Sequence, residues 1–461
     1  MLRRQFLSRV GAGALLASQH LARASTAQPN IVLIYADDLG YGDLNCYGSK
    51  LRTPNINRLA TEGARLTHFY SASAVCSPAR AALLTGGYPS RAGVPFVISP
   101  GDTWGLDESR KTMGDLLQAA GYRTMIAGKW HLGNQRKYSP NQRGFHEAVG
   151  IPYSSDMTPL HYVVNETVTV PNVAVEGLTA RYTEDAVDFI QRSKDGPFFL
   201  FMPHSAPHIP LAPSSRFRRM NAMGLYGNCV EEVDWSVGQI MKAVADNGLE
   251  ANTLIIFTSD NGPWYQGSVG GLRGRKGQTM EGGFRVPFVA RCPNLIPKGQ
   301  VIETMATALD LMPTFARLAG ASLPGQPMDG LDILPLLSGQ TATLDREVFL
   351  YFDGYHIQCA RLRNWKLHMS RFNLPPYLRS VPVSLRENLP LPRPELYNVV
   401  EDPTESAEAG RDNPEIVEEI LGRIRALLPG MPEDVRAAWE ATAKIAVEPT
   451  PAGAYPVRAG G

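Results

Sequence analysis

Several continuous apolar runs constrain the fold of this chain more than any other feature of its sequence. Residues 30–36, 197–202 and 253–259 are rich in Ile, Val, Leu and Phe and show no regular alternation with polar residues. Strands of this kind are buried on both faces, which is typical of parallel sheets covered by helices. Residues 121–127 form a further predicted strand, whereas residues 138–175 show little periodicity and are predicted to be loop-rich. We therefore expect an α/β fold with a large, doubly wound, mostly parallel sheet flanked by helices.

The pattern changes beyond about residue 340. Short strand patterns at hairpin spacing follow, a Pro-rich segment at 373–394 interrupts them, and a helical pattern covers about 414–428. This order is typical of a small α+β unit with an antiparallel sheet. After the N-terminus we expect an α/β domain at residues 25–340, a smaller C-terminal α+β subdomain at 341–445, and a disordered Pro/Ala/Gly-rich tail at 446–461.

The N-terminus carries the features of an export signal. Arg3 and Arg4 precede a weakly apolar run at residues 10–16 and a small-residue site at Ala22–Ala24. The segment is similar to a twin-arginine signal, and its apolar run is too short to cross a bilayer as a helix. We expect residues 1–24 to be a signal peptide. The protein would then use the twin-arginine export machinery, have no stable membrane span, and be periplasmic or secreted from a bacterium.

Charge and cysteine usage exclude several classes of protein. The net charge of +1 and the pI near 7.7 provide no overall field for nucleic acid or an anionic membrane. Cysteines 46, 76, 229, 292 and 359 are far apart and form no Cys-x-x-Cys pair, so a zinc-finger site is excluded. The odd count leaves one cysteine without an internal partner, and the sequence leaves open whether the other four pair.

Polar residues follow the predicted strands where each strand ends. They are Asp37 and Asp38, then Lys129 and His131, then His204 and His208, and finally Asp260 and Asn261. The carboxyl ends of parallel strands meet at one edge of a sheet, where ligands gather, so these side chains are expected to converge. Adjacent carboxylates repel unless a cation neutralises them, so these pairs are candidate metal ligands. For each pair taken alone, a solvated Asp-Asp or Asp-Asn-Gly turn is the alternative. An all-oxygen ligand set favours Ca²⁺ or Mg²⁺ over zinc or copper.

Cys76 lies near the predicted start of a helix. Pro78 suits the first helical position, the following small and apolar residues propagate the helix, and Gly86 can end it. Free N–H groups at a helix N-terminus favour an anion, and Arg80, four residues on, reaches the same face. An oxyanion could be held against residue 76, although an inert buried cysteine is the alternative interpretation of this segment alone.

Two segments resemble signatures of a known enzyme family. Cys76-Ser-Pro78-Ala-Arg80, followed by Leu84-Thr85-Gly86, resembles the signature of the formylglycine-dependent sulfatases, although Ala79 stands where the family often has serine. Gly121-Tyr122-Arg-Thr, followed by Gly128-Lys129 and Leu132-Gly133, resembles the second signature. The resemblance covers about residues 30–426. It implies an alkaline-phosphatase-like fold, and it points first to the arylsulfatase and N-acetylgalactosamine-6-sulfatase branch.

The resemblance also implies a mechanism and its residues. Cys76 would be converted to 3-oxoalanine (formylglycine) by a formylglycine-generating enzyme, and its hydrated aldehyde would attack sulfur to form a covalent sulfate ester on residue 76. The substrate would be an aryl or carbohydrate sulfate, hydrolysed to alcohol and inorganic sulfate. His208 would protonate the leaving alcohol, His204 would only support it, and His131 would take the proton that releases sulfate. The remaining implied groups are sulfate-binding Arg80, Lys129, His208 and Lys276, and Ca²⁺ (alternatively Mg²⁺) held by Asp37, Asp38, Cys76, Asp260 and Asn261.

Two alternatives stay open at this point. The same cationic cradle can hold phosphorus oxyanions, so a phosphonate or phosphodiester hydrolase is the nearer alternative. A carbohydrate-binding pseudoenzyme in which Cys76 stays a thiol is the more distant one. Relative turnover on matched sulfate and phosphate esters distinguishes the phosphorus ester hydrolase from a sulfatase. Mass analysis of residue 76 distinguishes the pseudoenzyme from a sulfatase.

Overall fold

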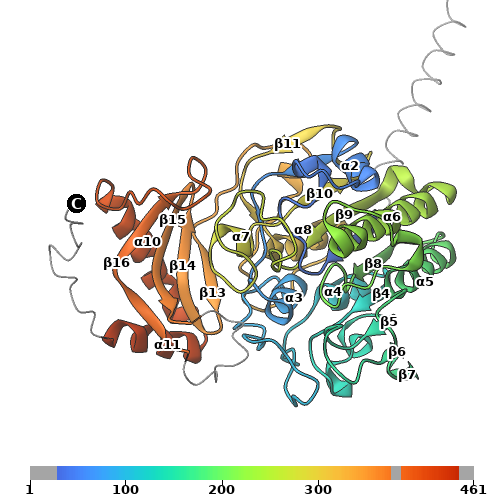
Figure 1. Ribbon diagram of the computed structural model, residues 1–461, viewed down its shortest axis with the longest axis horizontal. Coiled ribbons are helices and arrows are strands. Elements are labelled where there is room, and N and C mark those ends of the chain that lie inside the picture. Colours follow the sequence, from blue (N-terminus) through green and yellow to red (C-terminus); the bar gives the residue numbers. More distant parts are fainter. Residues whose placement is uncertain (1–27, 375–385, 446–461) are drawn as a thin grey trace, which may run out of the picture.

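The computed structural model describes residues 28–374 and 386–445 of the chain. The predicted signal peptide and the predicted C-terminal tail lie outside these residues. Within them, a ten-stranded sheet has the order β11-β2-β10-β9-β1-β8-β4-β5-β6-β7 (Figure 1). Its strands are β1 (Asn30–Ala36), β2 (Ala64–Leu66), β4 (Arg123–Lys129), β5 (Glu147–Ile151), β6 (Tyr162–Val164), β7 (Thr167–Val170), β8 (Phe198–Pro203), β9 (Thr253–Ser259), β10 (Phe288–Arg291) and β11 (Gln300–Ile302).

The centre of the sheet is parallel, as the apolar runs predict. β1 pairs with β8 and with β9, so that Ile31 lies opposite Phe199 on one side and Leu254 on the other. Alternate residues of β1 enter two different cores, because successive side chains of a strand point to opposite faces. Helices cover both faces, which confirms the doubly wound α/β architecture. One face packs on α3 (Cys76–Thr85), α4 (Met113–Ala119) and α8 (Leu311–Ala319), and the other on α2 (Pro54–Thr61), α5 (Leu178–Arg192) and α6 (Gly224–Asp246).

The C-terminal part forms a second sheet, coloured orange to red in Figure 1. Its four strands are antiparallel and are covered by two helices. They are β13 (Phe349–Asp353), β14 (His356–Leu362), β15 (Trp365–Phe372), β16 (Asn388–Asn398), α10 (Pro414–Leu427) and α11 (Glu433–Lys444). Their core includes Tyr70, Ala82 and Phe284 from the first part of the chain, so apolar packing is continuous across residue 340.

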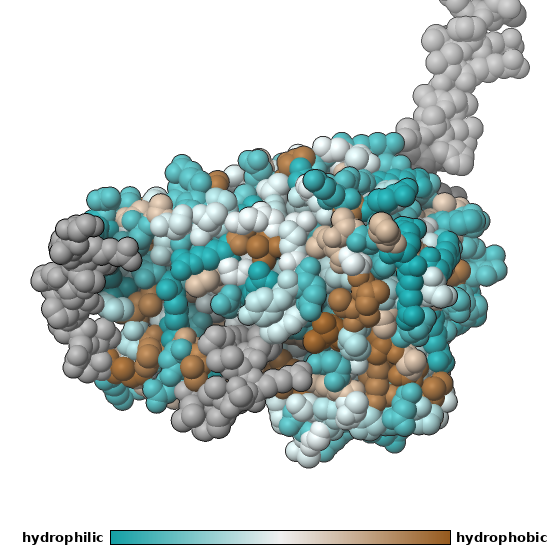
Figure 2. All heavy atoms as spheres, in the orientation of Figure 1, coloured by the Kyte–Doolittle hydropathy of each residue, from teal (hydrophilic) through white to brown (hydrophobic). Residues whose placement is uncertain are grey.

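The smaller elements lie in the connections. They are β3 (Phe69–Tyr70), β12 (Ala306–Thr307), α7 (Glu281–Phe284) and α9 (Leu334–Leu337), with 3-10 turns at Asn45–Tyr47, Arg136–Tyr138, Pro140–Arg143, Ser215–Phe217, Glu250–Asn252, Ala308–Asp310 and Leu428–Gly430. In the part of the chain that the structure describes, no helix has the length and apolar composition needed to cross a bilayer. Hydrophilic residues cover much of the face seen in Figure 2, and hydrophobic ones gather mainly in its lower right part.

The structure adds to or corrects the sequence analysis at four points. The segment 138–175 is loop-rich, as expected, but it also contains β5, β6 and β7, which extend the sheet at its edge. β16 begins at Asn388, inside the expected Pro-rich interruption, and α11 is an additional helix. Helix α3 begins at Cys76, so Pro78 lies within its first turn and not at its first position. Edge strands of three to five residues carry too weak a periodicity to be recognised from sequence, and tertiary pairing decides them.

Candidate active site

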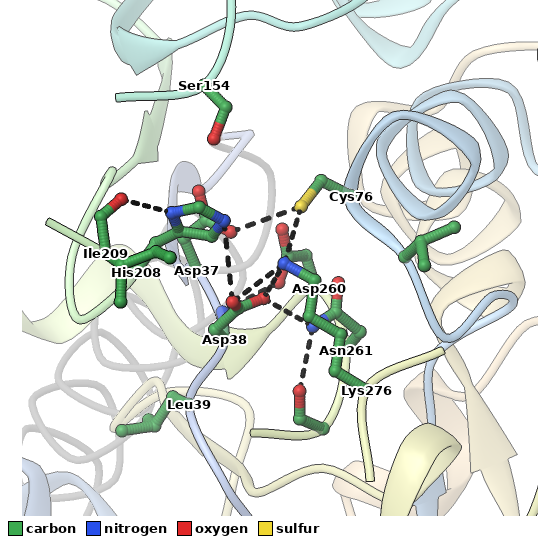
Figure 3. A network of polar contacts seen from close by, with 12 residues as sticks. Asp37, Asp38, Leu39, Cys76, Ser154, His208, Ile209, Asp260, Asn261 and Lys276 are labelled. Atoms are coloured by element: carbon green, nitrogen blue, oxygen red, sulfur yellow. Dashed lines mark hydrogen bonds and ion pairs between the residues drawn. The ribbon is translucent and has the colours of Figure 1, made fainter. Parts of the chain in front are cut away.

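The predicted site residues converge at the carboxyl ends of the central strands (Figure 3). Asp37 and Asp38 directly follow β1, Lys129 ends β4, and Asp260 and Asn261 directly follow β9. The other members are Cys76 and Arg80 on α3, His208 in the connection after β8, and Lys276 in the connection between β9 and β10. All of them are buried. Four separate segments of sheet and one helix therefore supply a single polar cluster.

An acidic group at the centre of this cluster has the composition of a metal site. Ligand atoms of Asp37, Asp38, Cys76 and His208 all lie within 4.8 Å of one another. Asp260 joins them, because its Oδ1 accepts a hydrogen bond from the backbone N–H of Asp38 at 3.1 Å.

Asn261 completes the oxygen-rich side of the cluster. Its Nδ2 donates to Asp38 Oδ1 at 2.7 Å, and its buried Oδ1 has no hydrogen-bond partner among the described residues. Buried amide oxygens are almost always satisfied, so this one fits the role of a cation ligand. Three carboxylates and an amide oxygen are hard donors, and the set fits Ca²⁺ or Mg²⁺.

Three basic side chains balance the three carboxylates. Lys129 Nζ lies 2.5 Å from Asp37 Oδ2, and Arg80 NH2 lies 3.0 Å from Asp260 Oδ2. Lys276 Nζ lies 2.5 Å from Asp38 Oδ1 and 3.4 Å from Cys76 Sγ. Because these formal charges cancel, the cluster can accept a divalent cation and an anionic ester together without a large net charge.

The carboxyl groups respond differently to this environment. Burial would raise the pKa of Asp37, but the charges of Lys129, His208 and Arg80 hold it well below the ordinary value. For Asp260, burial and the neighbouring charge of Asp37 raise the pKa to about 7. Since metal ligands must be deprotonated, cation binding would displace a proton chiefly from Asp260.

Cys76 faces this cluster from the first turn of α3. Its Sγ lies 3.5 Å from Asp37 Oδ1. Burial and the charge of Asp37 raise the pKa of the thiol to about 12, so it is neutral at pH 7. The thiolate is the nucleophilic form of cysteine, and unmodified Cys76 is therefore a poor nucleophile.

The three histidines of the predicted site have distinct orientations. His208 Nδ1 bonds the carbonyl oxygen of Ile209 at 2.6 Å, and its Nε2 lies 3.5 Å from Asp38 Oδ2, so the ring faces the cluster. His131 Nε2 bonds the carbonyl oxygen of Ile98 at 2.9 Å, and burial, Lys129 and Arg80 hold its pKa well below the ordinary value. His204 instead bonds Ser236 on α6 at 3.4 Å. His208 and His131 thus lie at the cluster, whereas His204 supports the wall behind it.

Sequence reasoning missed one member of the cluster. Ser154, in the connection after β5, accepts a hydrogen bond from Lys129 Nζ at 3.1 Å and is buried (Figure 3). It belongs to no motif, and the strands that deliver it were not predicted. A serine in a segment without periodicity carries no local signal of function.

Comparison with known proteins gives a consistent result. Residues 29–321 match the family model described as sulfatase, and residues 275–426 match the model described as N-sulphoglucosamine sulphohydrolase, C-terminal. Arylsulfatase A of Homo sapiens is 41% identical over 361 residues, which cover 71% of this chain and 71% of the relative. N-acetylgalactosamine-6-sulfatase of Rattus norvegicus is 37% identical over 383 residues, which cover 76% of this chain and 73% of the relative.

A solved structure agrees over most of the chain. The crystal structure of Ps i-CgsB in complex with k-i-k-neocarrahexaose superimposes with a TM-score of 0.73 at 28% identity. The superposition covers 90% of this chain and 98% of that one.

Proposed function

The chain belongs to the sulfatase family and is a sulfuric ester hydrolase, and we propose that it cleaves aryl or carbohydrate sulfates at the cluster around residue 76. One observation carries the proposal. The neutral Cys76 thiol lies between a carboxylate at 3.5 Å and the ammonium group of Lys276 at 3.4 Å, beside a balanced set of carboxylates and basic groups. Because the unmodified thiol is a poor nucleophile in this position, the proposed reaction requires its conversion to formylglycine by a formylglycine-generating enzyme.

The basic groups bind and orient the sulfate. Lys129 pairs with Asp37, Lys276 pairs with Asp38, and Arg80 pairs with Asp260. Buried, preorganised cations stabilise the negative charge that develops on the sulfate oxygens during transfer. A divalent cation held by Asp37, Asp38, Asp260 and Asn261 would supply Lewis-acid polarisation there. Ca²⁺ is the proposed ion and Mg²⁺ the alternative.

The histidines move protons. His208 Nε2 faces the cluster and is proposed to protonate the leaving alcohol. Burial and Lys276 lower the pKa of His208, and a bound sulfate anion next to the ring opposes that effect. His131 Nε2 bonds the carbonyl oxygen of Ile98, and its Nδ1 has no hydrogen-bond partner among the described residues. This ring is proposed to take the proton from residue 76 that allows sulfate to leave.

Mass analysis of the peptide containing residue 76, together with turnover, tests this function. Protein co-produced with a formylglycine-generating enzyme should carry the aldehyde and release inorganic sulfate from an aryl sulfate. Cys76→Ala should lose at least about 10³-fold in kcat/KM while its melting temperature stays unchanged. Cys229→Ala, which removes another buried cysteine, is the matched control.

Each other outcome has a meaning. Full turnover by Cys76→Ala would reject the nucleophile. Faster turnover of matched phosphate or phosphonate esters would favour the alternative hydrolase, and an unmodified thiol without turnover would favour the pseudoenzyme.

Carbohydrate sulfates are the proposed natural substrates. The neocarrahexaose bound by one structural relative supports this class, and the name arylsulfatase A in another supports aryl sulfates as model substrates. A panel of sulfated oligosaccharides and aryl sulfates, assayed by sulfate release, separates the two.

The remaining expectations concern the whole chain. Twin-arginine export of residues 1–24 and a periplasmic or secreted location are part of the proposal, as is the division into units at 25–340 and 341–445. Detection of the mature N-terminus at residue 25 in a periplasmic fraction tests the export step.

A further inference from the structure

A buried polar network joins the C-terminal sheet to the loop that carries Lys276. This Lys276 loop, residues 270–283, has no regular structure before α7. Four of its glycines, Gly270, Gly271, Gly274 and Gly277, have φ between 65° and 86°, a region that few other residues adopt. Such a glycine-rich loop does not hold a lysine in one place by its own backbone preferences, so contacts from outside it must do so.

Glu405, in the connection after β16, contacts the loop on both sides of Lys276. Its carbonyl oxygen accepts a hydrogen bond from Arg273 NH1 at 2.6 Å. Its carboxylate Oε2 accepts one from the backbone N–H of Glu281 at 2.9 Å. The loop is therefore attached to Glu405 at two points, three residues before Lys276 and five residues after it.

The other oxygen of Glu405 is held by the second sheet. Its Oε1 lies 3.0 Å from Lys366 Nζ and 2.7 Å from His368 Nε2, both on β15. Lys366 also lies 3.2 Å from Glu281 Oε1, so the sheet contacts the loop end directly as well. The side chains of Glu405, Lys366, His368 and Glu281 are all 0% exposed. In a low dielectric, a fully connected network of this kind is rigid and costly to break.

The charge state of this network follows from its geometry. Burial would raise the pKa of Glu405, but Lys366 and the hydrogen bond from His368 lower it to about 2. Its carboxylate is therefore ionised at neutral pH, and its hydrogen bond with the backbone N–H of Glu281 is charge-assisted.

We infer that Glu405 is a positioning residue for Lys276, through which the C-terminal sheet holds the sulfate-binding lysine against Asp38 and residue 76. The inference rests on the proposed role of Lys276. It gives the C-terminal subdomain a function in the reaction, although none of the subdomain's described residues belongs to the cluster around Cys76. Since misplacement of a binding group by about 1 Å is enough to cost up to about a hundredfold in rate, anchoring of the loop is part of the catalytic geometry.

A double-mutant cycle on inorganic sulfate binding tests the inference. The dissociation constant is measured by calorimetry for the full-length protein, Glu405→Gln, Lys276→Ala and the double variant. Glu405→Gln should weaken sulfate binding about tenfold in the parent protein and less than about twofold in the Lys276→Ala background. Glu419→Gln, which removes a surface carboxylate of α10 that pairs with Arg363 and Arg423, is the control and should bind sulfate like the parent.

Hydrogen exchange provides a second readout that is independent of sulfate. Amides of the Lys276 loop should exchange faster in Glu405→Gln, whereas amides of β1 should not change. An equal loss of sulfate affinity in both backgrounds, or unchanged exchange in the loop, would overturn the inference.

One further variant and one result of the cycle itself keep the test decisive. If Glu405→Gln does not fold, Arg273→Met removes one attachment without burying an unpaired charge, and it should show the same dependence on Lys276. If Lys276→Ala binds sulfate as the parent does, the proposed role of Lys276 is wrong. The exchange data then still decide whether Glu405 anchors the loop.

Discussion

The burial of His204 predicts a measurable dependence of stability on pH. This side chain is fully buried at the end of β8, and burial lowers its pKa to about 3. An ordinary histidine, as in the unfolded chain, has a pKa of about 6.5. Between these values the unfolded chain binds more protons than the folded one, so stability falls as the pH decreases from 6.5 towards 3.

The magnitude follows from this difference in pKa. At 1.36 kcal/mol for each pKa unit, the full loss approaches about 5 kcal/mol below pH 3. At pH 5 the loss is about 2 kcal/mol.

Urea denaturation at pH 7 and pH 5 measures this effect in His204→Gln, which cannot titrate. Between pH 7 and pH 5, the free energy of unfolding should fall by about 2 kcal/mol less in the variant than in the parent. His146→Gln, at an exposed position, is the control and should follow the parent. An unchanged loss in His204→Gln would refute the reasoning. Because His204 contacts Ser236 and not the acidic cluster, its replacement should also leave most of kcat intact at pH 7.

Three further predictions address the site. Chelation of divalent cations should abolish turnover and lower the melting temperature, and adding Ca²⁺ should restore both. The reason is that a ligand bound only to the folded state stabilises that state. An unchanged melting curve would count against the metal site. Gly128→Ala should destabilise the fold by roughly 3 kcal/mol in urea denaturation, because φ is 147° and a Cβ would lie 1.9 Å from the Pro203 carbonyl oxygen; parental stability would contradict the close approach. Ser154→Ala should lower kcat/KM about tenfold at an unchanged melting temperature, because Lys129 loses an acceptor; parental kinetics would leave Ser154 without a role.

Predictability from sequence differed between the centre and the periphery of the fold. The strands β1, β4, β8 and β9 were evident, because strands buried on both faces carry an uninterrupted apolar run at their centre. The edge strands β5 to β7 were not, because short edge strands depend on pairing with a neighbour that local sequence does not reveal. The start of α3 was misjudged by two residues, since Pro is also tolerated within the first turn of a helix.

The sequence by itself determined which chemical groups this protein has and on which elements they stand. Asp37, Cys76, Lys129 and Asp260 could be placed at strand ends or at a helix N-terminus, because apolar runs and helix signals depend only on neighbouring residues. Tertiary structure alone decided which charges face one another, that His208 points into the cluster while His204 points away, and that Glu405 attaches the Lys276 loop. These relations join residues far apart in the chain. Pairing of β1 with β8, packing of α6 on the large sheet and packing of the two sheets bring them into contact.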